Sequence, residues 1–476
     1  MKIRSLVLRL CLAVAFLAAG SRTAEAHGDL KSSNPANNAT LAVPPRRLTL
    51  VFTERPEMAL TKVRLLGPTG VEISLGKLSA TGADKATILA DITGAMSAGT
   101  YTVEWEIAGE DGHPVDGKFT FTVLQDTAAV SAPVATTVDS ARASADTQHA
   151  HHDPTTMPTS PDRFDAESGG YVAVRFALYA ALLVVIGAVA FRVIVLGLVG
   201  RQPQPDDLFI AAASGRAAAV GRIAVSLLIA ACVARLIAQS VALNGAAVAP
   251  DRLSSLVFAT NWGRSWMVQL LAAVAAFAGF HLARRRRPDQ NGAVGWSMAA
   301  IAGLVLAFTP AFASHAAALP QRSGLAIGAD GLHVLGAAGW LGSLTIVLIA
   351  GIPAAMSLGE GRRGTAVAEL INAFSPTALL FAGLVTATGI FAAWQHLASV
   401  TDLWTSSYGK LLLAKLAVLS AVALTGAYNW LRVKPSLGSD DGVGRIRRSA
   451  RVEVAVAVAV LLVTAILVAT PTPMDR

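Results

Sequence analysis

Long apolar runs constrain this chain more than any other feature of its sequence. Each of eight runs has about 20 or more residues, enough to cross a bilayer core of about 30 Å as a helix. Charged residues are only 15% of the 476 residues, too few to cover so much apolar surface in water. The sequence therefore excludes a soluble or disordered protein and predicts an all-α polytopic membrane bundle over residues 170–472. The runs cover roughly residues 172–196, 217–243, 260–282, 293–314, 326–352, 368–395, 408–431 and 452–470.

The loops between these runs alternate in positive charge. The first, third, fifth and seventh loops carry most of the Lys and Arg residues, including the run from Arg284 to Arg287. The other loops carry little beyond Arg252 and Arg322. Because positively charged loops stay in the cytoplasm, we expect both chain ends of the bundle to lie on the opposite, external side of the membrane. The net charge is +8, but the Lys and Arg residues are scattered between apolar runs. There they set the orientation of the protein in the membrane and do not indicate nucleic-acid binding.

Residues 1–26 have the pattern of a secretory signal peptide. Basic residues precede a short apolar stretch, and Ala24-Glu25-Ala26 forms a small-x-small cleavage site. An uncleaved anchor helix is the alternative. Cleavage would leave His27 at the N-terminus, where its α-amine and its imidazole Nδ1 can chelate one metal ion. We therefore expect a bacterial inner-membrane protein whose N-terminal domain lies in the periplasm.

Residues 27–124 have the pattern of a small β-domain. Short runs rich in Val, Ile, Thr and aromatic residues alternate apolar with polar positions, as in the segment from Tyr101 to Trp105. Pro and Gly separate these runs. The spacing predicts an all-β, immunoglobulin-like antiparallel sandwich. Strands are expected near residues 48–52, 61–66, 86–92, 100–107 and 118–123.

Three residues of this domain form a candidate metal site. Asp111 and His113 are two positions apart, so their side chains point to the same side of an extended backbone. With His27 they offer two imidazoles, an amine and a carboxylate, a set that suits Cu(II). Taken without His27, the Asp-x-His pair is more typical of a solvated turn than of a metal site.

Residues 125–169 are rich in Ala, Ser, Thr, Pro and Asp and show no sustained periodicity, which predicts a flexible linker. The linker contains His149, His151 and His152. These residues are either a weak metal relay between the two domains or histidines that cluster by chance in a solvated segment.

The β-domain resembles the periplasmic copper-binding family CopC. The residues that carry the likeness run from His27 to Ala36 and from Asp111 to Gly117. The resemblance implies a small β-sandwich that holds Cu(II) through the N-terminal His27 and through Asp111 and His113. Some members of the family also have a Met-rich Cu(I) site. We do not expect that second site in this chain, because the two methionines of its β-domain lie far apart in sequence.

The membrane part resembles CopD, the inner-membrane partner of CopC. The likeness rests on the segments from Leu332 to Gly342 and from Leu403 to Lys410. CopD is associated with copper uptake and copper resistance, and fused CopC–CopD chains are a known arrangement. The resemblance implies a copper-homeostasis protein, not an enzyme, with copper ions, the lipid bilayer and periplasmic copper donor proteins as partners.

Three histidines fall at the outer ends of predicted spans. His315 ends the fourth, His333 lies inside the fifth and His396 ends the sixth. Polar residues in spans are costly, so they indicate function. We predict that these three histidines line the external mouth of a path for copper through the membrane part. Cu(I) is a candidate for the ion that this path carries. The alternative is three interfacial histidines hydrogen-bonded to backbone.

Three function classes remain open at this point. The first is copper transport, in which the N-terminal domain captures Cu(II) and hands it to the membrane domain. The second is a copper-dependent oxidative enzyme built on the N-terminal His27. The third is a haem-binding membrane cytochrome, which needs paired histidines deep within spans. No Gly-Lys-Ser/Thr phosphate-binding motif occurs, so ATP-driven pumping is not expected.

Overall fold

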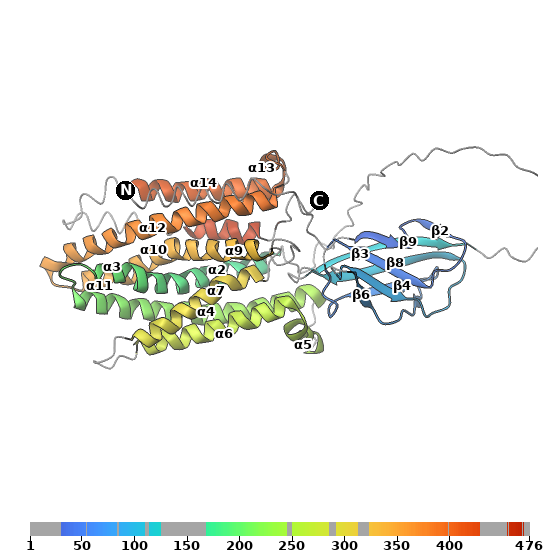
Figure 1. Cartoon of the computed structure of the whole chain (residues 1–476), viewed down its shortest axis with the longest axis horizontal. Helices are drawn as coiled ribbons and strands as arrows, with labels where there is room; N and C mark the ends of the chain where they lie inside the picture. The colour runs from blue at the N-terminus through green and yellow to red at the C-terminus, as the bar shows by residue number, and fades with distance from the viewer. Residues whose placement is uncertain are drawn as a thin grey trace, which may run out of the picture.

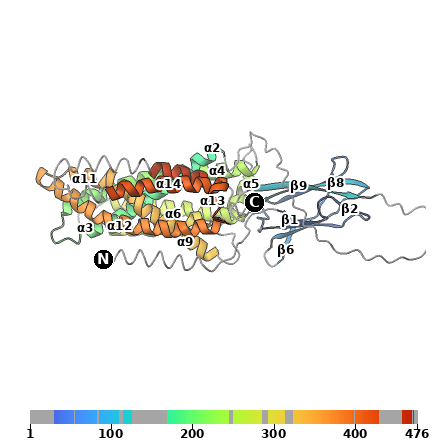
Figure 2. The ribbon, with the colours of Figure 1, turned by 90° about the horizontal axis from the view of Figure 1, so that it is seen from above.

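The computed structural model of the chain consists of a β-sandwich and a helical bundle (Figure 1). The same two parts are seen from above in Figure 2. The expected fold class, a β-sandwich followed by an all-α membrane bundle, is confirmed. The structure describes residues 30–53, 55–82, 85–109, 114–124, 168–244, 250–284, 292–312, 323–397, 399–428, 455, 457–468 and 470.

The sandwich has two sheets. The four-stranded sheet has the order β1 (Leu30–Asn34), β3 (Arg47–Phe52), β7 (Thr87–Asp91), β6 (Ser79–Thr81). The five-stranded sheet has the order β2 (Ala39–Leu41), β9 (Pro114–Val123), β8 (Gly99–Ala108), β4 (Lys62–Leu66), β5 (Glu72–Ile73). The described pairs are antiparallel except β2–β9, which is parallel because β2 crosses directly from β1 to the other sheet.

The sandwich core follows from alternation along the strands. In β8 the side chains of Tyr101, Val103 and Trp105 are buried, whereas the intervening residues are partly exposed. The Trp105 ring packs edge-on against Phe52 of the other sheet, with ring centroids 5.2 Å apart. Period-two alternation therefore builds one apolar layer between the sheets.

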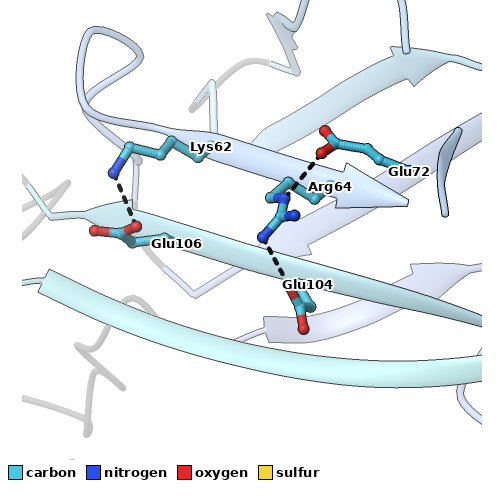
Figure 3. A network of polar contacts seen from close by, with 5 residues as sticks. All are labelled: Lys62, Arg64, Glu72, Glu104 and Glu106. Atoms are coloured by element: carbon cyan, nitrogen blue, oxygen red, sulfur yellow. Dashed lines mark hydrogen bonds and ion pairs between the residues drawn. The ribbon is translucent and has the colours of Figure 1, made fainter. Parts of the chain in front are cut away.

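The opposite face of the five-stranded sheet carries a network of ion pairs (Figure 3). Lys62 pairs with Glu106 at 2.9 Å, and Arg64 pairs with Glu72 at 3.2 Å and with Glu104 at 3.4 Å. These side chains are largely solvated, so each pair contributes at most about 1 kcal/mol to stability. This face is therefore a polar exterior, as the sequence alternation predicts.

The bundle is built from long apolar helices. The first is α2 (Gly169–Ala190), extended by η1 (Phe191–Val195) and α3 (Leu196–Val199). Next come α4 (Asp207–Asn244), α5 (Pro250–Ala259), α6 (Asn261–Arg284) and α7 (Ala293–Phe312). A continuous helical rod follows: α9 (Ser323–Ala337), η2 (Ala338–Gly342), α10 (Ser343–Ile346), η3 (Val347–Gly351) and α11 (Ile352–Met356). The last labelled helices are α12 (Glu360–His396), α13 (Asp402–Thr405) and α14 (Ser407–Tyr428).

Within the described residues, six helices are long and apolar enough to cross a membrane. They coincide with the first six predicted spans. The seventh predicted span contains α14, and the eighth contains a shorter apolar helix, Ala457–Leu467. The predicted count of eight is therefore approximate.

Glycines allow the fifth span to pack closely against two neighbours. A Cβ on Gly342 would lie 2.1 Å from the carbonyl oxygen of Leu183 in α2, so only glycine fits there. A Cβ on Gly336 would lie 2.8 Å from Val385 in α12, and Gly339 meets the Phe381 ring of the same helix. Small residues at these crossings bring the helix backbones together. This packing positions the α9–α12 pair described below.

Candidate copper sites

Most of the predicted copper ligands lie outside the described residues. This holds for His27, Asp111 and His113 in the sandwich. It also holds for His149, His151 and His152 in the linker and for His315 in the membrane part. The structure does describe the strands that flank the first three. His27 precedes the start of β1 by three residues, and Asp111 and His113 lie between the end of β8 and the start of β9.

Those flanking strand ends lie at one end of the sandwich. Leu30 at the start of β1 pairs with Phe52, whose ring packs against Trp105 near the end of β8. Ala108, the last residue of β8, pairs with Pro114, the first residue of β9. The start of β1, the end of β8 and the start of β9 are therefore close together across the two sheets. Sequence spacing alone does not give this proximity.

The same end of the sandwich contacts the membrane part, as the position of α5 in Figure 1 shows. Leu60 and Ala108 belong to an apolar cluster with Trp262 of α6. The Glu57 carboxylate accepts a hydrogen bond from the backbone N–H of Asn261 at 2.7 Å. The sandwich is therefore docked where α5 ends and α6 begins.

His333 lies in α9, half-buried, with Nδ1 2.9 Å from the Thr388 hydroxyl oxygen in α12. The single hydroxyl proton of Thr388 is donated to the carbonyl oxygen of Leu384 at 2.7 Å. The His333 ring also hydrogen-bonds the backbone of Val385, so two groups of α12 fix its orientation. Hydrogen bonds that fix a ring in this way are typical of imidazoles that bind metal ions.

Two charged groups lie near His333. The Lys415 ammonium of α14 is close enough to interact electrostatically with the His333 ring, and Asp330 of α9 interacts with Lys415. The ammonium opposes a cation at this position, and the Asp330 carboxylate offsets that repulsion. The α9–α12–α14 group is therefore polar inside at the depth of His333.

His396 is the last residue of α12, and its ring centroid lies 5.9 Å from that of Tyr408. It follows Thr388 by eight residues, about 12 Å along the helix axis. His333 and His396 therefore lie at different depths. Among the described residues, no three His, Cys, Asp or Glu side chains come together to hold a metal ion.

Sequence reasoning missed a second buried polar group in α4, α6 and α7. Gln269 donates to the Thr309 hydroxyl at 3.0 Å, and the Cys232 thiol lies 3.6 Å from the Gln269 carbonyl oxygen. The Trp266 indole N–H donates to the carbonyl of Cys232 at 2.8 Å. These contacts cross-link three helices. The sequence did offer one indication of this group, namely a polar residue inside a predicted span. The same indication applies to Thr388.

Three family descriptions match successive parts of the chain. The CopC domain matches residues 30–124. The Copper resistance protein D-like, N-terminal domain matches residues 165–325. Copper resistance protein D matches residues 368–467. The order of the matches is the order of the sandwich and the bundle.

Individual relatives agree with these matches. The chain is 23% identical to Copper transport protein CutJ of Bacillus subtilis (strain 168), over 97% of this chain and 77% of that protein. It is 31% identical to Copper resistance protein C of Xanthomonas campestris pv. juglandis, over 25% of this chain and 96% of that protein. The solved structure of PcoC, a copper resistance protein from Escherichia coli, is 29% identical. That match covers 20% of this chain and 98% of PcoC, with a TM-score of 0.18.

Both resemblances drawn from the sequence are thereby confirmed. The relatives are copper resistance and copper transport proteins, and the six apolar helices are those of a multi-pass membrane protein. The chain belongs to the family of fused CopC–CopD copper resistance proteins.

Proposed function

We propose that this protein captures Cu(II) in the periplasm with its sandwich and hands the copper to its membrane part for movement across the bacterial inner membrane. One observation carries the proposal. The strands that flank His27, Asp111 and His113 end on the side of the sandwich that docks on α5 and α6. An ion captured there starts its path next to the membrane part.

The capture step rests on the chemistry of the N-terminus. After cleavage behind Ala26, the α-amine and imidazole of His27 chelate the ion, and Asp111 and His113 complete a tetragonal set. Nitrogen and oxygen donors in this geometry favour Cu(II). Because the sandwich is docked, transfer does not need the linker residues His149, His151 and His152 as a relay.

The membrane step is proposed to begin at the outer histidines. The sequence predicts His315 at the end of the fourth span, His396 ends α12, and His333 lies deeper, in α9. Successive weak sites accept an ion without trapping it. The ion in this part is proposed to be Cu(I), which requires a reductant for Cu(II) during the hand-off.

The proposed orientation has the sandwich outside the cytoplasm. Arg201 follows α3, and Arg362 lies in the first turn of α12, directly after α11. Figure 1 shows α3 and α11 at the end of the bundle away from the sandwich. Arg362 forms an ion pair with Asp206 at 3.1 Å, which ties these loops together. Arginine at this end is what a cytoplasmic face requires.

Family membership favours copper handling over the two alternatives. The relatives are named for copper resistance and transport, not for oxidative catalysis. A haem cytochrome needs two facing histidines inside the bundle, whereas the three histidines described there, His281, His333 and His396, lie at different depths.

The capture step is tested by adding one residue before His27 in the full-length protein. The extension removes the amine–imidazole chelate and leaves the sandwich unchanged. Cu(II) affinity, measured by chelator competition, is expected to fall by at least about tenfold, the equivalent of about 1.4 kcal/mol. The same residue inserted in the linker is the control. Unchanged affinity in the extended protein would refute the assignment.

The transport step is tested by cellular copper content with and without the protein, at limiting and at excess copper. A difference in either condition is expected, and its sign gives the direction of movement. Equal copper content in both conditions would exclude transport.

A further inference from the structure

We infer that the place where α5 ends and α6 begins is a receptor surface that recognises the sandwich as a folded unit, so that the two parts bind each other without the linker. The inference goes beyond copper handling, because it concerns binding between the two parts whether or not an ion is present. It is argued from the contacts of Glu57, Leu60 and Ala108 with α6 and its neighbours.

The polar part of this surface is the first turn of α6. The N–H groups at the start of a helix have no intrahelical acceptor. The Thr260 hydroxyl accepts one of them, from Gly263 at 2.9 Å. The Glu57 carboxylate of the sandwich accepts another, from Asn261 at 2.7 Å. A carboxylate is also favoured there by the positive end of the helix dipole, so the sandwich completes the cap of a membrane helix.

The apolar part lies beside this cap. Leu60 and Ala108 of the sandwich share a cluster with Leu256, Val257 and Trp262 of the membrane part. Trp262 is only 1% exposed, and the Arg235 guanidinium lies 5.2 Å from the centre of its ring. A buried aromatic anchor beside a charged hydrogen bond is typical of specific protein–protein interfaces.

Both sides of the contact are rigid. On the membrane side, a Cβ at Gly263 would lie 2.1 Å from the carbonyl oxygen of Leu256, so α5 packs directly on the start of α6. On the sandwich side, the Glu57 N–H donates to the carbonyl of Ala108 at 2.8 Å, and the Leu60 N–H donates to the carbonyl of Glu57 at 2.9 Å. The docking turn 57–60 is therefore fixed to the end of β8.

A polar rim borders the contact. A cavity of about 110 Å³ lies between the two parts, lined by Thr61, Lys62 and Glu106 of the sandwich and by Leu243 and Ser255 of the membrane part. The Lys62–Glu106 ion pair lies in this lining. An apolar centre with a polar, hydrated rim is the anatomy of an interface that forms between separate proteins.

The competing explanation is that the linker alone keeps the parts together. A flexible linker holds two modules at millimolar effective concentration, which is enough to populate a weak contact. Cutting the linker removes this contribution and leaves the interface to act by itself.

The experiment is therefore made on the full-length protein in detergent, with a protease site inserted in residues 125–167 and an affinity tag on the C-terminus. After cleavage, the rate at which the sandwich leaves the immobilised membrane part is measured. The wild-type sandwich is expected to stay bound. Glu57→Lys, which turns the cap into a repulsion, and Leu60→Asp, which places a charge in the apolar cluster, are each expected to release it at least about tenfold faster.

Glu72→Lys is the matched control, because it makes the same charge change on a solvated strand of the sandwich. It is expected to behave like the wild type. Loss of the wild-type sandwich immediately after cleavage would overturn the inference, as would release rates of Glu57→Lys and Leu60→Asp equal to that of the wild type. The Cu(II) affinity of each uncut variant is measured separately, so a docking failure and a failure of copper capture give different results.

Discussion

Nδ1 of His333 lies 2.9 Å from Oγ1 of Thr388, across the contact between α9 and α12. The helices approach closely enough for this bond because Gly336, one turn further along α9, meets Val385 of α12. Together with the hydrogen bond from the ring to the Val385 backbone, the contact with Thr388 fixes the orientation of the imidazole. An imidazole inside the bundle is thus oriented by a residue 55 positions away.

The first prediction concerns Thr388. Thr388→Val keeps the shape of the side chain and removes the hydroxyl that hydrogen-bonds Nδ1, so the orientation of His333 is less constrained. Replacing a residue that orients a metal ligand typically lowers metal affinity or activity by about 10- to 100-fold. The rate of copper accumulation is expected to fall by the same factor, since it depends on the metal affinity of His333. Thr388→Ser should retain the wild-type rate. Thr386→Val is the matched control, because Thr386 is exposed and bonds only its own helix at Ala382.

The second prediction concerns His333 itself. His333→Ala removes the ligand and is expected to lower copper accumulation at equal protein level, while Cu(II) binding by the sandwich stays unchanged. The comparison is His281→Ala, since His281 lies near the other end of the bundle and stacks on Phe277. Wild-type accumulation in His333→Ala would show that this histidine is an ordinary interfacial residue.

The third prediction concerns the crossing of α2 and η2. Gly342→Ala forces a methyl group against the carbonyl oxygen of Leu183, and such overpacking typically destabilises a core by about 1–3 kcal/mol. The thermal unfolding midpoint in detergent should fall. Gly215→Ala is the control: a Cβ there meets no atom within 4 Å, and alanine favours a helix over glycine by about 1 kcal/mol. An unchanged midpoint for Gly342→Ala would contradict the close crossing.

The fourth prediction concerns orientation. A cysteine at Thr401, on the exposed segment before α13, should react with an impermeant thiol reagent in intact cells. A cysteine at Gly361, at the start of α12, should be shielded until the cells are opened. The native Cys232 is buried and gives a low background. The reverse labelling pattern would place the sandwich in the cytoplasm and exclude periplasmic capture.

The sequence by itself determined the two-part architecture. Apolar runs of about 20 residues predict spans because a bilayer imposes that length on a helix. Alternation in the segment Tyr101–Trp105 predicts a strand with one buried face, because successive side chains point to opposite faces. Both signals depend only on neighbours in the chain. The number of spans stays approximate because the last two runs contain α14 and the short helix Ala457–Leu467, which are not among the six candidate spans of the described residues.

Only the tertiary structure decided which residues meet. Thr388 was one hydroxyl among several in a predicted span until the glycine crossings of α9 and α12 brought it to His333. Glu57 was a loop residue until the sandwich docked it on Asn261, 204 positions later. The physical reason is that such pairs depend on crossing angles, register and close backbone approach between distant segments, which local periodicity does not encode.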